Sequence, residues 1–274
     1  CLSSIEAEPS QQTTIHAVTL SEVHGRMILA ILIGRKGSVG FPDKNTKHIF
    51  GRPLFAYPLK AAAAVKEITK IIVSTDDPSI HAYIQNRTAS PYKGTPIQCL
   101  DRPSWLCTDD AQAGAVYQHV YHEATVHDTT TTQPEFAVLL MANAPMVTPQ
   151  LIQQGLAALR EDPSLDSAIT VSCYNMWNPA RARRIDTDGL LQPMVHLDGA
   201  TCDRNSVGDV WFADFGAVIV RPRCLDKLDG VGPQPWMGQH IYPLKNWGGF
   251  DIDYAWQMPQ IEYWLHQHGY TEIG

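Results

Sequence analysis

Two short segments, far apart in the sequence, carry side chains suited to phosphate chemistry. The first follows an apolar run at residues 28–33 and reads Gly34-Arg35-Lys36-Gly37-Ser38-Val39-Gly40, before Lys44 and Asn45. Glycines with this spacing let main-chain amides approach an anion closely. The side chains of Arg35, Lys36 and Lys44 supply positive charge. The segment therefore predicts a polyphosphate site.

The second segment is the acidic doublet Asp251-Ile252-Asp253. In an extended backbone, residues i and i+2 project to one side, so both carboxylates would share a face while Ile252 points into the core. Two such charges about 7 Å apart repel by about 2 kcal/mol at an effective dielectric of about 20, and a divalent cation removes that repulsion. Oxygen ligands of this kind suit Mg²⁺, which completes its octahedron with waters and substrate phosphates. The alternative is a loop whose aspartate caps the final helix.

The glycine spacing distinguishes the basic loop from other nucleotide-binding motifs. GxxGxxG is not the GxGxxG of dinucleotide-binding proteins, and no acidic residue about 20 positions later ends a second strand. A Walker loop is excluded because Gly37 lacks a following Lys-Ser/Thr pair at the required spacing and Pro42 prevents an immediate helix. A plain surface turn remains as an alternative, although turns rarely carry this set of polar residues directly after a buried strand.

The order of apolar segments predicts an α/β fold that brings these residues together. Uninterrupted apolar runs are typical of strands covered on both faces. We expect strands at residues 28–33, 68–74, 96–100, 136–141, 168–173 and 215–220, and helices at 54–66, 78–86, 110–125 and 148–160, the last with Thr148 as its N-cap. A final helix spans 254–268 or begins at Pro259. Alternating strands and helices indicate a three-layer α/β/α arrangement with a mostly parallel, doubly wound sheet, whose ligands bind at the carboxyl ends of the strands.

The domain organisation is predicted to be simple. Residues 1–26 are polar, lack the features of a signal peptide and are expected to form a flexible extension, and residues 27–274 form one domain. Between about 174 and 214 the pattern breaks into short pieces around the turn signals Asp188-Gly189 and Asp198-Gly199, which predicts an inserted arm.

Composition limits the possible partners. The 274 residues include 44% hydrophobic and 18% charged residues, as in ordinary globular proteins. A net charge of -7 argues against nucleic-acid binding. No apolar run approaches about 18 residues, so we expect no membrane span and a cytoplasmic protein. The six cysteines show no zinc-site spacing and are expected to be free thiols.

A series of motifs then resembles a known family. The loop from Gly34 to Asn45 is followed in order by Gly51-Arg-Pro53-Leu, Ile71-Ile-Val-Ser-Thr-Asp-Asp77, Asp101-Arg102-Pro-Ser-Trp-Leu-Cys-Thr108-Asp109, Leu139-Leu-Met-Ala-Asn-Ala-Pro145 and Phe250-Asp251-Ile-Asp253. This series, over roughly residues 27–268, is similar to the acylneuraminate cytidylyltransferases, which activate sugar acids with CTP. The resemblance implies an α/β nucleotidyltransferase that uses CTP and Mg²⁺ and transfers CMP to an acidic acceptor with release of pyrophosphate. It also implies a homodimer in which the arm crosses to the second subunit.

The resemblance also implies roles for individual residues. Arg35 and Lys44 are expected to act catalytically by stabilising the triphosphate and the departing pyrophosphate, and Asp251 and Asp253 to hold Mg²⁺. The implied nucleotide-binding residues are Gly34, Gly37, Ser38, Asn45, Arg102 and Thr108, and Asn143 is the implied substrate-binding residue. Arg102 could alternatively form a surface ion pair. Independently of the resemblance, Asp76 and Asp77 end the second predicted strand, where a parallel α/β sheet would expose them toward the ligand crevice. The alternative, which we favour, is that they cap the helix that begins at Pro78.

Several departures from the family pattern concern the acceptor. Val39 replaces the usual lysine, Phe215 replaces an asparagine, and residues 141–147 replace Gln-Pro-Thr-Ser-Pro-Leu-Arg. The expected acceptor is a nonulosonic or other 2-keto-3-deoxy sugar acid. A small phosphonate acid is the alternative, and a catalytically silent, nucleotide-binding homodimer is a third possibility. Retention of Arg35 and Lys44 together with the acidic doublet argues against the silent protein.

Overall fold

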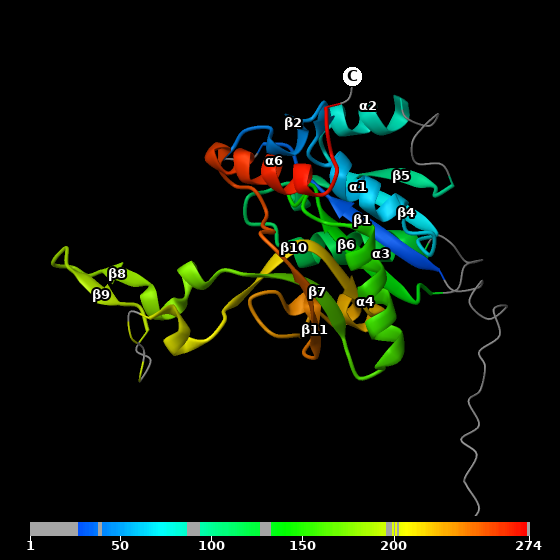
Figure 1. Cartoon of the computed structure of the whole chain (residues 1–274). Helices are drawn as coiled ribbons and strands as arrows, with labels where there is room; N and C mark the ends of the chain where they lie inside the picture. The colour runs from blue at the N-terminus through cyan, green and yellow to red at the C-terminus, as the bar shows by residue number, and fades with distance from the viewer. Residues whose placement is uncertain are drawn as a thin grey trace, which may run out of the picture.

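A mixed seven-stranded sheet forms the centre of the molecule (Figure 1). The structure is a computed structural model and describes residues 27–37, 40–86, 94–126, 133–195, 199, 201 and 203–272, so the predicted extension at residues 1–26 lies outside it, as do Ser38 and Val39. In spatial order the strands are β11 (Ile241–Asn246), β7 (Ser167–Cys173), β10 (Trp211–Val220), β6 (Phe136–Met141), β1 (Ile28–Ile33), β4 (Lys70–Thr75) and β5 (Ile97–Asp101). All neighbouring pairs are parallel except those made by β10, which runs antiparallel to β6 and β7. The predicted mostly parallel α/β sheet is confirmed.

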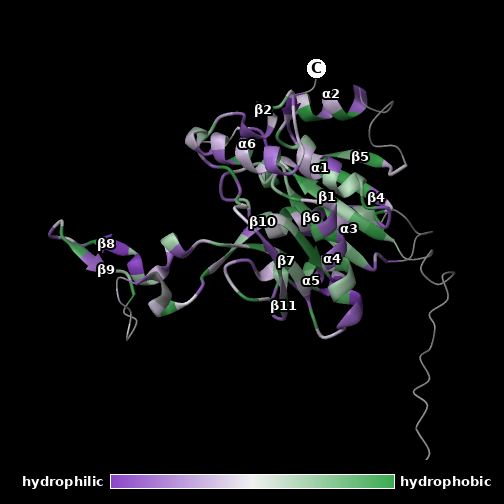
Figure 2. Ribbon diagram, viewed as in Figure 1, coloured by the Kyte–Doolittle hydropathy of each residue, from purple (hydrophilic) through white to green (hydrophobic). Residues whose placement is uncertain are grey.

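Helices cover both faces of this sheet because its central strands are apolar on both sides. In β1, Ala30 and Leu32 belong to one core and Leu29 and Ile31 to the other. The first core includes side chains of α1 (Ala56–Ala63), α2 (Pro78–Asn86) and α4 (Pro149–Glu161). The second includes side chains of α3 (Ala113–Val126) and α5 (Pro222–Lys227). Figure 2 shows the resulting hydrophobic centre, with polar residues gathered toward the outside.

Local signals explain where several elements begin. Thr148 caps α4 as predicted, since its Oγ1 accepts a hydrogen bond from the amide of Leu151 at 3.3 Å. The last helix, α6 (Met258–Gln267), has Pro259 in its first turn, so the helix starts there and is not kinked. Strand β11 was not predicted. It contains Pro243, which an edge strand tolerates and which obscures the strand pattern in the sequence.

The predicted arm leaves the sheet after β7 and returns at β10. It contains the hairpin of β8 (Arg183–Ile185) and β9 (Leu191–Pro193), which turns at Gly189 as predicted and projects from the body in Figure 1. A second small hairpin, β2 (His48–Ile49) with β3 (Arg52–Pro53), lies between β1 and α1. The arm was predicted to end at about residue 214, but β10 already begins at Trp211, so the arm is shorter than predicted.

Two further observations bear on the composition of the chain. Cys99, Cys107, Cys173 and Cys224 are free thiols, as predicted for the described cysteines. Within the described ranges, no helix combines the length and apolar character that a membrane span requires.

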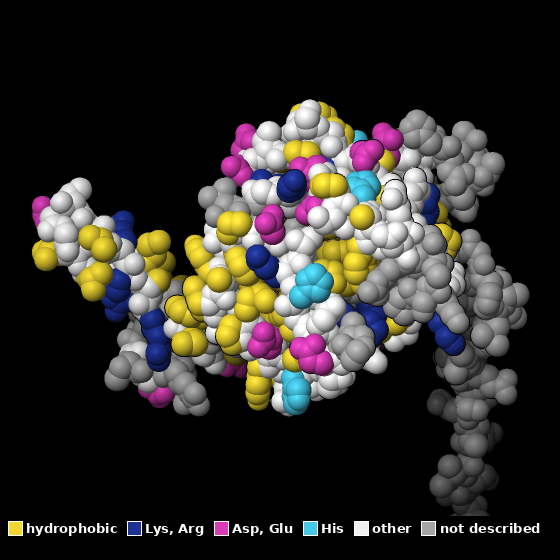
Figure 3. All heavy atoms as spheres, turned by 90° about the horizontal axis from the view of Figure 1, so that it is seen from above, with side chains coloured by type: hydrophobic (Ala, Val, Ile, Leu, Met, Phe, Trp, Pro, Cys, Tyr) yellow, Lys and Arg dark blue, Asp and Glu magenta, His cyan; other side chains and the backbone are white. Residues whose placement is uncertain are grey.

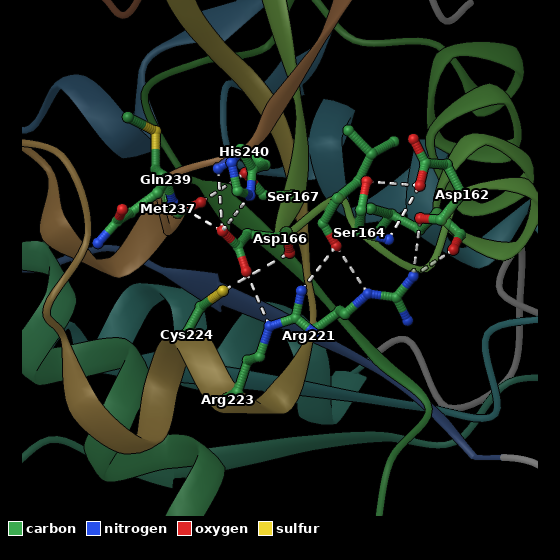
Figure 4. A network of polar contacts seen from close by, with 12 residues as sticks. Asp162, Ser164, Asp166, Ser167, Arg221, Arg223, Cys224, Met237, Gln239 and His240 are labelled. Carbon is green, nitrogen blue, oxygen red and sulfur yellow. Dashed lines mark hydrogen bonds and ion pairs between the residues drawn. The ribbon is translucent and has the colours of Figure 1, made fainter.

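A polar network at the amino-terminal ends of β7 and β11 braces the sheet on the edge where these parallel strands begin (Figure 4). Asp166 accepts hydrogen bonds from the amides of Gln239 and His240 at 2.8 and 2.9 Å and from Nε of Arg223 at 2.8 Å. Burial opposes ionisation, but these hydrogen bonds prevail and lower the pKa of Asp166. The carboxylate therefore fixes the connection between α5 and β11 to the start of β7.

Replacing Asp166 with Asn is expected to lower the free energy of unfolding by about 1–3 kcal/mol, because a charged acceptor of three hydrogen bonds becomes a neutral one. Chemical denaturation of the two proteins measures the difference. An unchanged unfolding midpoint would contradict this structural role.

Candidate functional site

A cavity of about 370 Å³ opens at the carboxyl ends of β1, β5 and β6. Its lining includes most of the residues singled out from the sequence, namely Gly34, Arg35, Lys44, Asn45, Arg102, Asn143 and Asp253. These residues follow β1, β5, β6 and β11, which all run in the same direction, so they meet at one edge of the sheet. Gly37, Thr108 and Asp251 are not among the lining residues, and Ser38 lies outside the described residues.

The basic loop and the acidic doublet meet directly in this cavity. Nζ of Lys44 donates to Oδ1 of Asp253 at 2.7 Å and to the carbonyl oxygen of Ile252 at 2.8 Å. The Lys44 side chain is only 14% exposed, whereas that of Asp253 is 57% exposed. Partial burial strengthens the contact, and the open side of Asp253 leaves carboxylate oxygens accessible to a ligand.

Asp251 is fixed by the loop that follows β6. Nδ2 of Asn143 contacts Oδ2 of Asp251 at 3.4 Å and the carbonyl of Ile252 at 3.2 Å, and the amide of Ile252 donates to the carbonyl of Asn143 at 2.9 Å. Ile252 is fully buried, as predicted, and packs in a core with Trp264 and Leu265 of α6. Burial, and secondarily the charge of Asp253, raise the pKa of Asp251. Holding the ionised Asp251 in this position therefore costs electrostatic free energy.

The donor set fits Mg²⁺. In the described parts of the chain, no group of three or more His, Cys, Asp or Glu residues is arranged to hold a metal. Two adjacent carboxylates without a third protein ligand suit Mg²⁺, which is usually bound by one or two carboxylates together with substrate phosphates. Burial is the main cause of the raised pKa of Asp251 and the charge of Asp253 the second, and a cation between the carboxylates would relieve the second.

Arg35 lines the cavity and contacts the segment that follows β5. Its Nη2 forms an ion pair with Oδ1 of Asp109 at 2.5 Å, and its Nη1 donates to the carbonyl of Gly37 at 3.3 Å. Gly37 has φ 79°, a conformation that favours glycine. Asp109 directly follows Thr108 in the motif, but the sequence offered no sign that it pairs with Arg35. Because Asp109 is 70% exposed, the pair is weak and exchangeable.

Two buried side chains present polar atoms without partners beside the cavity. Nη2 of Arg102 donates to the carbonyl of Ser74 at 2.9 Å, while its Nε has no hydrogen-bond partner among the described residues. Nδ2 of Asn45 donates to the carbonyl of Arg35 at 3.0 Å, while its Oδ1 is likewise without a partner there. Arg102 is 8% exposed, so the alternative of a surface ion pair is wrong. Burial lowers its pKa, and Asp76 opposes that shift. Unsatisfied buried groups of this kind are typical of ligand sites.

The two aspartates after β4 have different roles. Asp77 caps α2 as predicted, with its Oδ1 accepting from the amide of Ser79 at 2.8 Å. For Asp76 the capping prediction is wrong, because its Oδ1 accepts from the amide of Lys36 at 2.7 Å. Asp76 therefore anchors the glycine-rich loop, a role that depends on the pairing of β1 with β4.

An apolar wall completes the cavity. It consists of Met141 at the end of β6, of Ala111 before α3, and of Ala113 and Val116 in the first turn of α3. The helix was predicted, but nothing in its sequence indicated that its first turn faces the basic loop. The cavity thus combines a cationic and carboxylate side with an apolar side.

Replacing Asp251 with Asn is expected to raise the Tm of the metal-free protein near neutral pH. The folded-state pKa of Asp251 lies above its ordinary value of 3.8, so the ionised carboxylate destabilises the folded state above that raised pKa. Each kcal/mol relieved corresponds to about 2–4 °C. Thermal unfolding in EDTA, with the exposed Asp229→Asn as control, measures the effect, which should shrink as the pH falls through the raised pKa. A lower Tm for Asp251→Asn would contradict it.

Comparisons with known proteins identify the relatives of this chain. A family model described as Cytidylyltransferase matches residues 29–185. The N-acylneuraminate cytidylyltransferase of Escherichia coli is 25% identical over 193 residues, which are 70% of this chain and 42% of that protein. The CMP-N,N'-diacetyllegionaminic acid synthase of Legionella pneumophila is 26% identical over 205 residues, which are 70% of this chain and 80% of that protein. The chain thus spans less than half the length of the Escherichia coli relative.

Two solved structures share the fold. One is described as CMP:2-keto-3-deoxy-manno-octonic acid synthetase complexed with CTP and has a TM-score of 0.59 at 17% identity, over 88% of this chain and 99% of that one. The other is the 4-diphosphocytidyl-2C-methyl-D-erythritol synthase of Anaerococcus prevotii, with a TM-score of 0.56 at 15% identity, over 91% of this chain and 100% of that one. Because the family match covers more than half of the sequence, this protein belongs to the Cytidylyltransferase family.

Proposed function

We propose that this protein is a CTP-dependent cytidylyltransferase that transfers CMP to a small acidic acceptor and releases pyrophosphate. The observation that carries the proposal is the contact of Lys44 with Asp253 in the cavity that Arg35 and Asn45 also line. Cations beside a carboxylate pair at the carboxyl edge of an α/β sheet suit a magnesium-bound triphosphate. The family match supports the same activity.

In the proposed reaction, the protein mainly positions charge. An acceptor oxygen bonds to the α-phosphorus of CTP while the bond to the bridging oxygen of pyrophosphate breaks. Arg35 and Lys44 bind the phosphates and stabilise the negative charge that develops on the leaving group. Asp251 and Asp253 would hold Mg²⁺, which when bound neutralises phosphate charge. The ion pair of Arg35 with exposed Asp109 is worth about 0–1 kcal/mol, so a triphosphate can replace Asp109 at little cost.

The cytosine base is proposed to bind on the apolar side. Ala111, Ala113 and Val116 offer a surface for a flat ring, and Nε of Arg102 is a buried donor without a partner in the described parts of the chain. A single donor finds an acceptor on cytosine and on adenine alike, so the proposed selectivity for CTP over ATP rests on the family match.

The acceptor is proposed to be a nonulosonic or other 2-keto-3-deoxy sugar acid, as the names of the Escherichia coli and Legionella pneumophila relatives suggest. Asn143 lies two residues after β6 and lines the cavity, so it is the residue proposed to contact the acceptor. A small phosphonate acid is the second candidate. It is favoured by residues 141–147, in which Met141 lines the cavity and Ala142, Ala144 and Met146 are buried. This segment contains no hydroxyl or cationic side chain with which to bind a sugar acid.

A homodimer is proposed from the arm. Its exposed side chains include Met176, Trp177, Ile185, Leu191 and Met194, each more than half exposed. Figure 3 shows hydrophobic side chains on the arm and on the neighbouring face of the body. An apolar surface of this kind is typical of a protein interface, and a second copy of the chain is the partner that the family resemblance implies.

A pyrophosphate-release assay with CTP, Mg²⁺ and a panel of sugar acids and phosphonates tests the function. Asp251→Asn and Asp253→Asn are each expected to remove nearly all release while leaving the fold intact, because Mg²⁺ loses a ligand. Asp229→Asn, an exposed aspartate outside the cavity lining, serves as control. ATP should not replace CTP. Normal turnover in both the Asp251 and the Asp253 variant would contradict the proposal. No turnover of any acceptor by the wild type would also contradict it and would favour a silent nucleotide-binding protein.

The role of Arg35 is tested by CTP binding without an acceptor. Arg35→Ala is expected to weaken CTP binding about 10-fold to 100-fold, because a charge-assisted contact to phosphate is lost. Isothermal titration calorimetry measures the affinity. Asp109→Asn is the matched control, since it removes the ion-pair partner, keeps the cation and should not weaken binding. Equal affinities for wild type and Arg35→Ala would remove Arg35 from the site.

A further inference from the structure

A buried carboxylate outside the cavity lies at the centre of a second polar network. Asp214 of β10 is only 2% exposed. Its Oδ2 accepts hydrogen bonds from Oγ of Ser172 at 2.7 Å and from Nδ2 of Asn246 at 3.1 Å, and its Oδ1 accepts from the amide of Gly216 at 3.1 Å. Burying a carboxylate among neutral donors costs free energy, so we expect Asp214 to have a role that offsets this cost.

A bulge in β10 directs Asp214 inward. The register between β10 and β7 shifts between Ala213 and Val218, so the residues from 214 to 217 lie opposite Thr170 alone. Phe215 has φ 55°, a conformation that few residues other than glycine adopt. Thr170 fills the gap, since its Oγ1 accepts from the amide of Ala217 at 3.1 Å. Bulges often redirect side chains next to functional sites.

The network reaches the acidic doublet from two directions. Oγ of Ser172 accepts from the amide of Gly249 at 2.9 Å, two residues before Asp251. A Cβ at Gly249 would lie 2.4 Å from Oδ2 of Asp214, so only glycine permits this approach. Nδ2 of Asn246 also donates to the carbonyl of Met146 at 3.0 Å, in the segment whose Asn143 contacts Asp251.

We propose that Asp214 is a positioning residue, which through Ser172 and Asn246 holds residues 249–253 so that Asp251 and Asp253 face a divalent cation together. The inference rests on the proposed function. Asp214 itself is 2% exposed and is not among the residues that line the cavity. The backbone before Asp251 is secured further by Tyr174, whose hydroxyl donates to the carbonyl of Gly249 at 2.9 Å.

The chain provides a matched control. Asp166 is also a largely buried carboxylate that accepts three hydrogen bonds, but it lies at the opposite edge of the sheet, where β7 and β11 begin. Asp166→Asn and Asp214→Asn each replace a carboxylate that accepts three hydrogen bonds, although Asp166 is also ion-paired with Arg223 and Asp214 has only neutral donors. A purely structural role for Asp214 predicts that neither variant changes metal binding, and a positioning role predicts that only Asp214→Asn does.

The test is Mn²⁺ binding in the presence of CTP and without acceptor, followed by electron paramagnetic resonance, with stability measured in parallel by denaturant. Asp214→Asn is expected to weaken Mn²⁺ binding on the order of 10-fold to 100-fold. Its affinity for CTP in EDTA, which depends on Arg35 and Lys44, should stay unchanged. Asp166→Asn should lose stability and keep the wild-type affinity for Mn²⁺.

Wild-type Mn²⁺ affinity in a folded Asp214→Asn protein would overturn the inference and leave the proposed function standing. A wild-type protein that binds no Mn²⁺ with CTP would overturn both. If Asp214→Asn does not fold, Ser172→Ala breaks the link to the amide of Gly249 while keeping Asp214. This variant should weaken Mn²⁺ binding in the same direction, and an unchanged affinity would overturn the inference.

Discussion

The contact between Lys44 and the segment containing Ile252 and Asp253 is the interaction on which the rest of the site depends. It joins the loop after the first strand to the loop before the last helix. A shared core supports it, because Ile252 packs with residues such as Leu54, Tyr57 and Leu265. Close backbone approach supports it as well, since a Cβ at Gly40 would lie 2.9 Å from the carbonyl oxygen of Asp253. These contacts hold the loop after β1 against the loop before α6, and the two loops together form one side of the cavity.

Much of the scaffold could be predicted from local patterns. The apolar run of β1, the Thr148 cap of α4 and the Asp188-Gly189 turn of the arm each have a local physical cause, and the structure contains all three. The convergence of the basic loop on the acidic doublet was also expected, because both were predicted to bind one magnesium-bound triphosphate, although strand β11 before the doublet was not predicted. The resemblance to a family added the roles of individual residues, which remain predictions.

Other features depend on tertiary contacts that no local pattern reveals. The pairing of Asp76 with the amide of Lys36, and of Asp109 with Arg35, requires knowledge of which strands are neighbours. The antiparallel direction of β10 and its bulge at Phe215 also had no local signal, since Phe at a positive φ is unexpected. Strand β11 was hidden by Pro243 and by the lack of a regular burial pattern, since Leu244 is its only buried residue. Sequence patterns therefore identified the reactive groups better than the residues that hold them.

The antiparallel entry of β10 beside β7 has a consequence for how this domain can diversify. Cys173 and Trp211, which flank the arm, are paired across the two strands, so the chain leaves and re-enters the sheet at the same point. An excursion with adjoining ends can be lengthened, shortened or exchanged without altering the strand order, because closing a longer loop costs little additional entropy. The arm can therefore change in length and sequence among homologous chains, and its surface can change while the sheet keeps its strand order.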